Sequence, residues 1–220
     1  MSFRFALFDM DGTVLDTLQD LASSVNYVLE KHAMPLRQID EVRSFVGGGM
    51  AKLISRVVPE GTDEAERNAV LADFKAYYGQ HCADLTKPYD GIPEMLSALR
   101  AAGIKTAVIS NKGDPAVQEL AKHYFDGMFD FVLGERPDIV RKPAPDMIYY
   151  ALEQMGASKD AAVYIGDSDV DIITADNAGL PAIGVTWGFR DRDCLISAGA
   201  TQLADTVGEL QALLLDAQIP

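Results

Sequence analysis

The stretch FRFALFDMDGT, residues 3–13, joins a short apolar run to two acids, a glycine and a threonine. The apolar and aromatic residues at positions 3–8 predict a buried β-strand. In a parallel sheet, ligands bind beyond the carboxyl ends of the strands, which is where Asp9 and Asp11 would lie. Gly12 permits a close backbone approach to a ligand, and the N–H groups from Thr13 onward can bind an anion. Taken alone, the segment also fits an ordinary turn with solvated acids.

Four further apolar or β-branched runs predict strands, and helical patterns lie between the later ones. The strands are expected at residues 105–109, 129–133, 161–165 and 182–186, and the helices at 93–102, 114–124, 146–155 and 169–178. Gly103, Gly156 and Gly179 each follow a helical pattern, as is typical of a helix C-terminus. This alternation predicts an α/β fold, a Rossmann-like doubly wound parallel sheet with helices on both faces.

The segment from residue 16 to residue 87 interrupts the alternation. Helical patterns occupy residues 18–31, 42–45, 50–58 and 65–82, and Pro35, Gly47–Gly49 and Pro59 separate them. We therefore expect a small α-helical cap domain at residues 16–87, inserted after the first strand. Residues 1–15 and 88–220 would form the catalytic core.

Composition and charge limit the partners. The 220 residues include 33 acidic and 19 basic side chains, and the net charge of -14 argues against a nucleic-acid partner. No apolar run approaches the roughly 20 residues that span a bilayer. Cys82 and Cys194 lack metal-ligand spacing and are expected to be free thiols. We expect a cytoplasmic protein without a membrane partner, either a monomer or a homodimer.

A second acidic cluster, GDSDVD at residues 166–171, follows the predicted strand at 161–165. Asp171 lies about one helical turn beyond Asp167. If both strands share a sheet, these two acids meet Asp9 and Asp11 at one edge, which is unfavourable without a cation. Oxygen ligands with no nearby histidine or cysteine favour Mg²⁺ over zinc. The alternative is a helix N-terminus enriched in acids.

Polar and basic residues after other strands complete the pattern. Ser110 and Asn111 follow the strand at 105–109, and Lys142 precedes a predicted helix. A carboxylate at 4 Å from a phosphate charge is repelled by about 4 kcal/mol at an effective dielectric constant near 20. Asp9 could therefore approach phosphorus only if a metal ion and Lys142 offset the charge.

These sequence motifs, in this order along the chain, resemble those of the haloacid dehalogenase superfamily. The matching residues are Asp9-x-Asp11-Gly12-Thr13, Ser110, Lys142 and Gly166-Asp167-Ser168-x-x-Asp171. The likeness spans essentially the whole chain, and the helical insert corresponds to the cap that this family places after its first motif. The resemblance implies a phosphatase that acts on a small phosphoester with Mg²⁺ as cofactor.

The resemblance also implies a role for each matching residue. Asp9 would be the nucleophile that forms an aspartyl-phosphate, and Asp11 the general acid and then base. Gly12, Thr13, Ser110 and Asn111 would bind the phosphoryl group, and Lys142 would steady Asp9 and the developing charge. The metal would be held by Asp9, the backbone carbonyl of Asp11, Asp167 and Asp171, the last directly or through water.

Three short segments, one in the predicted cap and two in the predicted core, point to a subgroup. SFVGGG at residues 44–49, SNK at 110–112 and WGFR at 187–190 resemble phosphoglycolate phosphatases, which favours 2-phosphoglycolate as substrate. Lys112, Arg43, Lys52 and Arg190 could meet a substrate carboxylate, but we expect solvated surface charges at all four positions. Asp11 argues against a dehalogenase, because that reaction needs no acid for a phosphoryl leaving group.

Two other functions remain open at this point. One is a sugar-phosphate mutase, which also keeps both acids of the first motif. The other is a non-enzymatic receiver module in which a strand-end aspartate accepts phosphate. The cap and Asp11 argue against the receiver, because a lasting phospho-aspartate should not lie beside a hydrolytic base.

Overall fold

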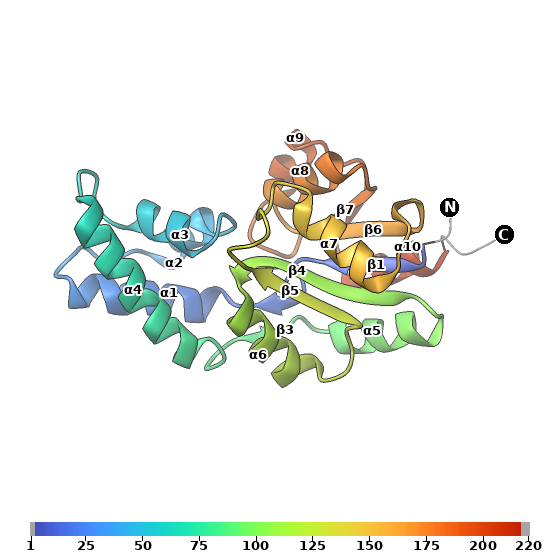
Figure 1. Cartoon of the computed structure of the whole chain (residues 1–220), viewed down its shortest axis with the longest axis horizontal. Helices are drawn as coiled ribbons and strands as arrows, with labels where there is room; N and C mark the ends of the chain where they lie inside the picture. The colour runs from blue at the N-terminus through green and yellow to red at the C-terminus, as the bar shows by residue number, and fades with distance from the viewer. Residues whose placement is uncertain (1–2, 217–220) are drawn as a thin grey trace.

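The computed structural model describes residues 3–216. Six parallel strands form one sheet in the order β5-β4-β1-β6-β7-β8 (Figure 1). Their bounds are β1 Phe5–Phe8, β4 Lys105–Gly113, β5 Phe131–Glu135, β6 Ala162–Gly166, β7 Ala182–Val185 and β8 Leu203–Ala204. Strand β1 pairs with both β4 and β6, with Phe8 opposite Val108 and Ile165. The first acidic motif therefore leaves the centre of the sheet, between the ends of its two neighbours.

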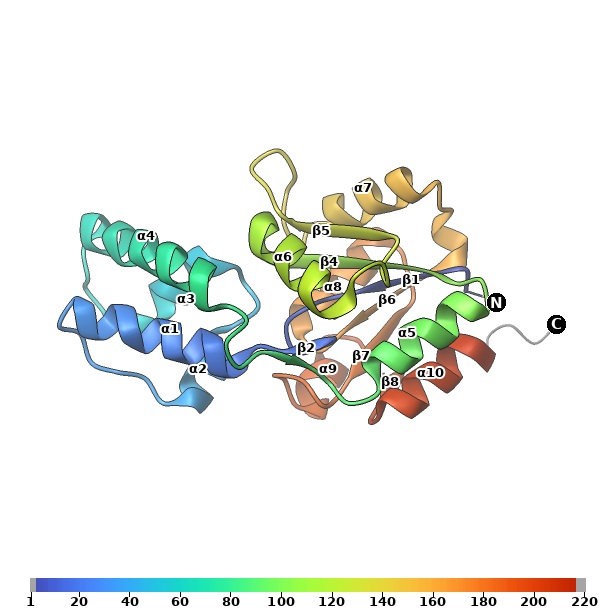
Figure 2. The ribbon, with the colours of Figure 1, turned by 90° about the horizontal axis from the view of Figure 1, so that it is seen from below.

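Helices cover both faces of the sheet (Figures 1 and 2). One face carries α5 (Ile92–Ala101), α6 (Asp114–Phe125) and α10 (Val207–Asp216), and the other carries α7 (Asp146–Met155) and α8 (Asp169–Ala178). Helix α9 (Arg192–Ser197) contacts α8, and a short 3₁₀ helix at Lys159–Ala161 precedes β6. Within β1, Phe8 belongs to the first apolar cluster and Leu7 to the second. The predicted fold class is confirmed.

All five predicted strands differ from the observed strands at one boundary or more, and the differences are largest at β4 and β5. The strand expected at 129–133 is β5 at Phe131–Glu135. Phe129 precedes it and packs edge-on against Phe8 and Phe125, with ring centroids 6.3 and 5.4 Å apart. The strand expected at 105–109 extends to Gly113 through an irregularity in its register with β5. That extension carries Ser110, Asn111 and Lys112 beyond the regular sheet.

A bundle of four helices lies beyond the carboxyl ends of the central strands (Figure 1). It contains α1 (Leu18–Lys31), α2 (Ile39–Phe45), α3 (Met50–Val57) and α4 (Glu64–His81). The chain enters and leaves this bundle through β2 (Leu15–Asp16) and β3 (Lys87–Pro88), which pair antiparallel. The division into core and cap stays a prediction, and positions 1–2 and 217–220 of the expected core lie outside the described residues.

A buried carboxylate fixes the exit from the bundle. Asp20, in the first turn of α1, accepts hydrogen bonds from the backbone N–H groups of Leu85 (3.0 Å) and Thr86 (2.8 Å). Tyr124 of α6 donates to the carbonyl of Thr86 at 2.6 Å. The two connections between bundle and sheet are thus tied to each other and to the core.

Two predictions from composition can be compared with these coordinates. Cys82 and Cys194 are both free, which confirms the absence of a disulfide between them. Over residues 3–216, none of the helices has the length and apolar character needed to cross a bilayer.

Candidate active site

Three carboxylates from separate parts of the sequence meet at the carboxyl edge of the sheet. Asp9 follows β1, Asp167 follows β6, and Asp171 lies in the first turn of α8. One oxygen from each lies within 4.8 Å of the others, and all three residues are buried. The structure thus brings together three of the four acids expected at the metal site. The carboxylate of Asp11 lies outside this cluster, so Asp11 could contribute only its backbone carbonyl, as the family pattern implies.

Residues 12–13 and 188–189 pack closely around the side chain of Asp167. Thr13 Oγ1 donates to Asp167 Oδ1 at 3.1 Å, and the N–H of Phe189 donates to Oδ2 at 2.7 Å. A Cβ on Gly12 or Gly188 would lie 2.3 Å from an atom of the Asp167 side chain. Gly12 also has φ +81°, a conformation that favours glycine. Gly12 and Thr13 both lie against Asp167, and their binding of a phosphoryl group stays a prediction.

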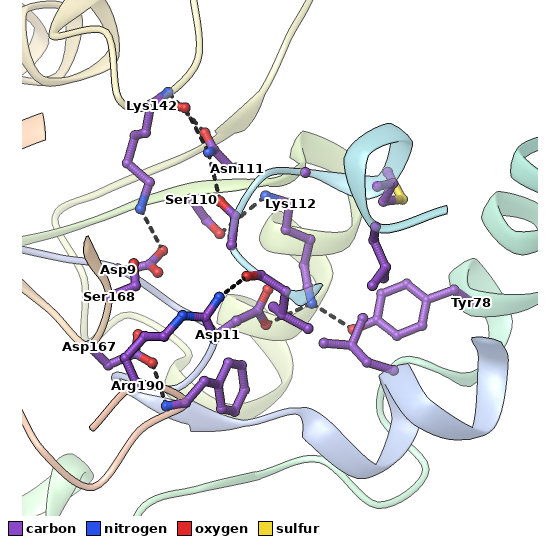
Figure 3. A pocket seen from close by; sticks show the side chains of 17 residues that line it. Asp9, Asp11, Tyr78, Ser110, Asn111, Lys112, Lys142, Asp167, Ser168 and Arg190 are labelled. Carbon is purple, nitrogen blue, oxygen red and sulfur yellow. Dashed lines mark hydrogen bonds and ion pairs between the residues drawn. The ribbon is translucent and has the colours of Figure 1, made fainter. Parts of the chain in front are cut away.

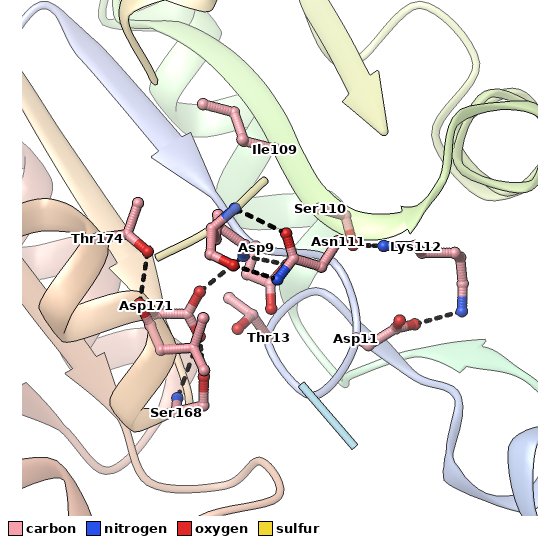
Figure 4. A network of polar contacts seen from close by, with 12 residues as sticks. Asp9, Asp11, Thr13, Ile109, Ser110, Asn111, Lys112, Ser168, Asp171 and Thr174 are labelled. Carbon is pink, nitrogen blue, oxygen red and sulfur yellow. Dashed lines mark hydrogen bonds and ion pairs between the residues drawn. The ribbon is translucent and has the colours of Figure 1, made fainter. Parts of the chain in front are cut away.

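Lys142 is the cation of the cluster and pairs with Asp9 and Asp171, whose carboxylates lie close together in Figure 4. Its Nζ lies 2.9 Å from Asp9 Oδ1 and 2.7 Å from Asp171 Oδ1. It also donates to the hydroxyl of Tyr164 at 2.9 Å. Asp171 Oδ2 accepts hydrogen bonds from Ser168 Oγ (2.6 Å) and from the Ser168 N–H (3.1 Å). Tyr164 was not predicted as a site residue, because an aromatic residue inside a strand is typical of the core.

The electrostatics of this cluster call for a further cation. Burial raises the pKa of Asp9 to about 7, although Lys142 acts in the opposite direction. Burial, with Asp171 and Asp9 adding to it, raises the pKa of Asp167 well above its ordinary value. Lys142 forms ion pairs with two of the three carboxylates, Asp9 and Asp171, so the three ionised carboxylates would outnumber the one ammonium group. The all-oxygen donor set fits a hard divalent cation bound by Asp9 and Asp167.

Asp11 lies apart from the cluster and forms an ion pair with Lys112. Lys112 Nζ donates to Asp11 Oδ1 at 2.7 Å and to the hydroxyl of Tyr78 at 2.6 Å. The expectation that Lys112 is a solvated surface charge is wrong, because only 5% of the residue is exposed. Tyr78 belongs to α4 and was missed by sequence reasoning, since it is one of several apolar positions on that helix. The hydrogen bond between Lys112 and Tyr78 thus joins the edge of the sheet to the helical bundle.

Ser110 and Asn111 line the same pocket but differ in their available groups. The Asn111 amide donates to the carbonyls of Gly47 (3.1 Å) and Lys142 (2.9 Å), and its oxygen accepts from the Lys142 N–H at 2.9 Å. Both amide hydrogens are therefore engaged, and Asn111 positions the backbone of Lys142. Ser110 Oγ accepts from the Lys112 N–H at 3.2 Å and can still donate its O–H to a ligand. Contact of either residue with a phosphoryl group stays a prediction.

The helical bundle forms the opposite wall of the pocket (Figure 3). Its contribution is largely apolar and comprises Leu21, Val46, Gly47, Gly49, Met50, Leu53 and Tyr78. The core supplies Phe189 and Arg190 from the loop after β7. The pocket thus lies between the acidic edge of the sheet and a largely apolar wall of the helical bundle.

Arg190 bridges the core and the bundle. Its guanidinium donates to the carbonyls of Arg43 (2.8 Å), Ser44 (3.2 Å) and Val46 (2.6 Å), at the C-terminal end of α2. The expectation of a solvated charge is therefore wrong for Arg190, whose side chain is 17% exposed. The same expectation is confirmed for Arg43 and Lys52, which are exposed.

Comparisons with known proteins agree with this geometry. A family model described as haloacid dehalogenase-like hydrolase matches residues 6–185. A phosphoglycolate phosphatase from Neisseria meningitidis is 33% identical and covers 92% of this chain and 88% of its own length. An N-acetylmuramic acid 6-phosphate phosphatase from Pseudomonas aeruginosa is also 33% identical, covering 96% of this chain and 94% of its own length.

The same fold occurs in solved structures. A candidate phosphoglycolate phosphatase from Lactobacillus delbrueckii subsp. bulgaricus superposes with a TM-score of 0.93 and 40% identity, covering 98% of this chain and 99% of that chain. The family model matches residues 6–185, and the relatives and the solved structure each cover more than nine-tenths of the chain. The chain therefore belongs to the haloacid dehalogenase-like hydrolases, as a phosphoric monoester hydrolase that resembles the phosphoglycolate phosphatases.

Proposed function

We propose that this enzyme is a Mg²⁺-dependent phosphatase that hydrolyses a small phosphate monoester, with 2-phosphoglycolate the favoured substrate, through an aspartyl-phosphate on Asp9. The observation that carries the proposal is the position of the Asp9 carboxylate. It lies 2.9 Å from the ammonium of Lys142 and within 4.8 Å of oxygens of Asp167 and Asp171. Asp11, a second acid, lines the same pocket without joining the cluster.

In the first step, a carboxylate oxygen of Asp9 attacks phosphorus and the bond from phosphorus to the leaving oxygen breaks. Asp11 donates its proton to that oxygen. In the second step, Asp11 takes a proton from a water molecule that attacks phosphorus, and phosphate leaves Asp9. Lys142 favours the ionised form of Asp9 and stabilises the added negative charge, and the Ser110 O–H donates to a phosphoryl oxygen.

The residues available for the metal are Asp9, Asp167 and the backbone carbonyl of Asp11, with Asp171 acting directly or through water. Bound Mg²⁺ would neutralise charge shared by the carboxylates and the phosphoryl group. Asp167 is suited to this task because Thr13 and Phe189 hold its carboxylate in place. Asp171 is already paired with Lys142, which fits a supporting position.

The assignment of the substrate rests on the relatives. Phosphoglycolate phosphatases from several bacteria are 30–33% identical over most of the chain. N-acetylmuramic acid 6-phosphate is the second candidate, because the Pseudomonas aeruginosa relative named for it is equally similar. A mutase and a receiver module are disfavoured, since the family and the relatives are hydrolases.

The helical bundle would act as the cap. We propose that residues 16–87 close over a core of residues 1–15 and 88–220, and that β2 and β3 form the connection between them. The hydrogen bonds of Asn111 to Gly47 and of Arg190 to Val46 support a closed arrangement. A cytoplasmic location fits a small soluble metabolite as substrate.

The test is steady-state phosphate release from 2-phosphoglycolate and from N-acetylmuramic acid 6-phosphate, with Mg²⁺ and with a chelator. We expect kcat/KM above roughly 10⁴ M⁻¹s⁻¹ for 2-phosphoglycolate, abolished by the chelator. Asp9→Asn should remove activity, whereas Asp176→Asn, a change at an exposed acid of α8, should not. Activity that survives in Asp9→Asn would refute the nucleophile, and activity that survives the chelator would refute the metal. A preference for the muramic acid ester would overturn only the substrate.

A further inference from the structure

Three basic side chains line the pocket: Lys142, Arg190 and Lys112. Lys142 lies between Asp9 and Asp171, where the phosphoryl group is transferred. Arg190 directs its donors to three backbone carbonyls of the bundle. Of the pocket-lining cations, Lys112 is therefore the one that faces the part of the substrate beyond the phosphoryl group.

Lys112 has a donor to spare. An ammonium group carries three N–H bonds, and two of them are used, at Asp11 Oδ1 (2.7 Å) and Tyr78 Oη (2.6 Å). Nζ also lies 4.7 Å from the centre of the Tyr78 ring, on the pocket side of α4 (Figure 3). Burial alone would lower the pKa of Lys112, but Asp11 and Tyr78 outweigh it and raise that pKa. Lys112 is thus a fixed, charged donor in the pocket wall.

The position of Asp11 locates the leaving group. If Asp11 protonates the leaving oxygen, that oxygen must come within hydrogen-bond reach of its carboxylate. Lys112 Nζ is 2.7 Å from the same carboxylate, so it lies next to the atoms bonded to the leaving oxygen. The bundle lines the pocket mainly with apolar side chains, among them Leu21, Met50 and Leu53, whereas Lys112 places a cation directly beside Asp11.

We infer that Lys112 determines specificity by binding a carboxylate on the carbon attached to the leaving oxygen. The enzyme would then select 2-phosphocarboxylates over neutral phosphoesters of the same size. In 2-phosphoglycolate a single carbon joins the ester oxygen to the carboxylate, so one ammonium group can contact both Asp11 and the substrate. Tyr78 of the bundle fixes Nζ in that position. The inference rests on the proposed phosphatase reaction and names the substrate class of that site.

The experiment compares 2-phosphoglycolate with 2-hydroxyethyl phosphate, in which an alcohol replaces the carboxylate. We would measure kcat/KM for both esters with Mg²⁺ in the wild type, Lys112→Gln, Tyr78→Phe and the control Lys52→Gln, a change at an exposed cation outside the pocket. The ratio of the two kcat/KM values should fall roughly 10- to 100-fold in Lys112→Gln, the usual weight of a charged hydrogen bond. It should fall less in Tyr78→Phe and stay constant in Lys52→Gln.

An equal loss on both esters in Lys112→Gln would overturn the inference, because Lys112 would then act only through Asp11. Equal use of the two esters by the wild type would also overturn it, while leaving the phosphatase intact. If neither ester is hydrolysed, the proposed substrate fails. Calorimetric binding of 2-phosphoglycolate and inorganic phosphate to Asp9→Asn, with and without Lys112→Gln, then decides the inference. A loss of affinity confined to 2-phosphoglycolate supports it, and unchanged affinity refutes it.

Discussion

The ammonium of Lys142 lies 2.7 Å from Asp171 Oδ1, and the side chains of Lys142 and Asp171 are 2% and 0% exposed. Burial acts against the charge on Lys142, but Asp171 and Asp9 outweigh it and raise the pKa of Lys142 well above its ordinary value. The two partners are not equivalent. Lys142 forms ion pairs with two carboxylates, Asp9 and Asp171. Loss of Asp171 still leaves the ion pair between Lys142 and Asp9.

Lys142→Met should therefore cost more stability than Asp171→Asn. Removal of the lysine leaves buried carboxylates unpaired, and we expect the free energy of unfolding to fall by about 3–5 kcal/mol. Asp171→Asn should cost about 1–2 kcal/mol, mainly through its hydrogen bonds. Urea unfolding of both single variants and the double variant measures these values and their coupling. If the two single variants lost the same free energy of unfolding, and the double variant lost the sum of the two, the paired arrangement would be contradicted.

Asp11→Asn separates the two steps of the reaction. With 2-phosphoglycolate, kcat should fall by about 10²–10⁴, because neither leaving-group protonation nor water activation is available. 4-Nitrophenyl phosphate has a good leaving group, so its first step depends less on the acid. We expect a burst of nitrophenolate equal to the enzyme concentration, followed by slow turnover. Steady-state release without a burst would argue against Asp11 as the base of the second step.

Metal binding should stabilise the folded protein through Asp167. At a hundred times the dissociation constant, Mg²⁺ should add about 2.7 kcal/mol to the free energy of unfolding of the wild type. Asp167→Asn should lose this increment. Without metal, this variant should be at least as stable as the wild type, because it removes a buried charge whose cost appears in the raised pKa of Asp167. Thermal melting with and without Mg²⁺ checks both outcomes, with Asp176→Asn, a change at an exposed acid of α8, as the control.

Arg190 should hold the end of α2 and the loop that follows it, residues 43–49, against the core. Its loss removes three charged hydrogen bonds to the carbonyls of residues 43, 44 and 46. In Arg190→Gln, hydrogen exchange in residues 43–50 should speed up about 10- to 100-fold, as expected for loss of charge-assisted bonds. Arg43→Gln alters an exposed neighbour and should leave exchange unchanged. Equal exchange in the two variants would show that other contacts keep the loop in place.

His32 should make the stability of the helical bundle depend on pH. Its ring nitrogens lie 2.7 Å from Glu66 and 2.8 Å from Asp73, and hydrogen bonds to Asp73 and Glu66 raise the pKa of His32 above its ordinary 6.5. The protonated ring therefore stabilises the fold fully below pH 6.5, and this contribution is lost as the pH rises through the folded-state pKa.

His32→Gln should accordingly cost about 1 kcal/mol at pH 6 and less at pH 9. Denaturant unfolding at the two pH values gives the difference. His81→Gln serves as the control, since its ring is more exposed and pairs with Asp84 alone. A cost for His32→Gln that is the same at both pH values would rule out a charged ring.

The sequence alone determined five of the six strands, most of the helices and the order of the acidic motifs, whereas β8, α9 and α10 were not predicted. Apolar runs that stop at Asp9 and Asp167 place both acids at strand ends, and parallel pairing of β1 with β6 brings those ends together. Local periodicity likewise gave α1 its bounds, Leu18–Lys31. Strand β5 was misplaced because Phe129 has the composition of a strand residue but packs against Phe8 and Phe125 from the preceding loop.

The tertiary structure alone decided which basic residues belong to the site. Lys112 follows the predicted strand at 105–109 and Lys52 lies in the predicted helix at 50–58, and neither pattern indicated that Lys112 is buried and Lys52 exposed. Burial of Lys112 depends on α4 lying over the end of β4, where Tyr78 and Asp11 supply its partners. Burial of the Arg190 side chain depends in the same way on the backbone carbonyls at the C-terminal end of α2, which accept its hydrogen bonds. A side chain's solvation is set by neighbours distant in sequence, and no local pattern carries that information.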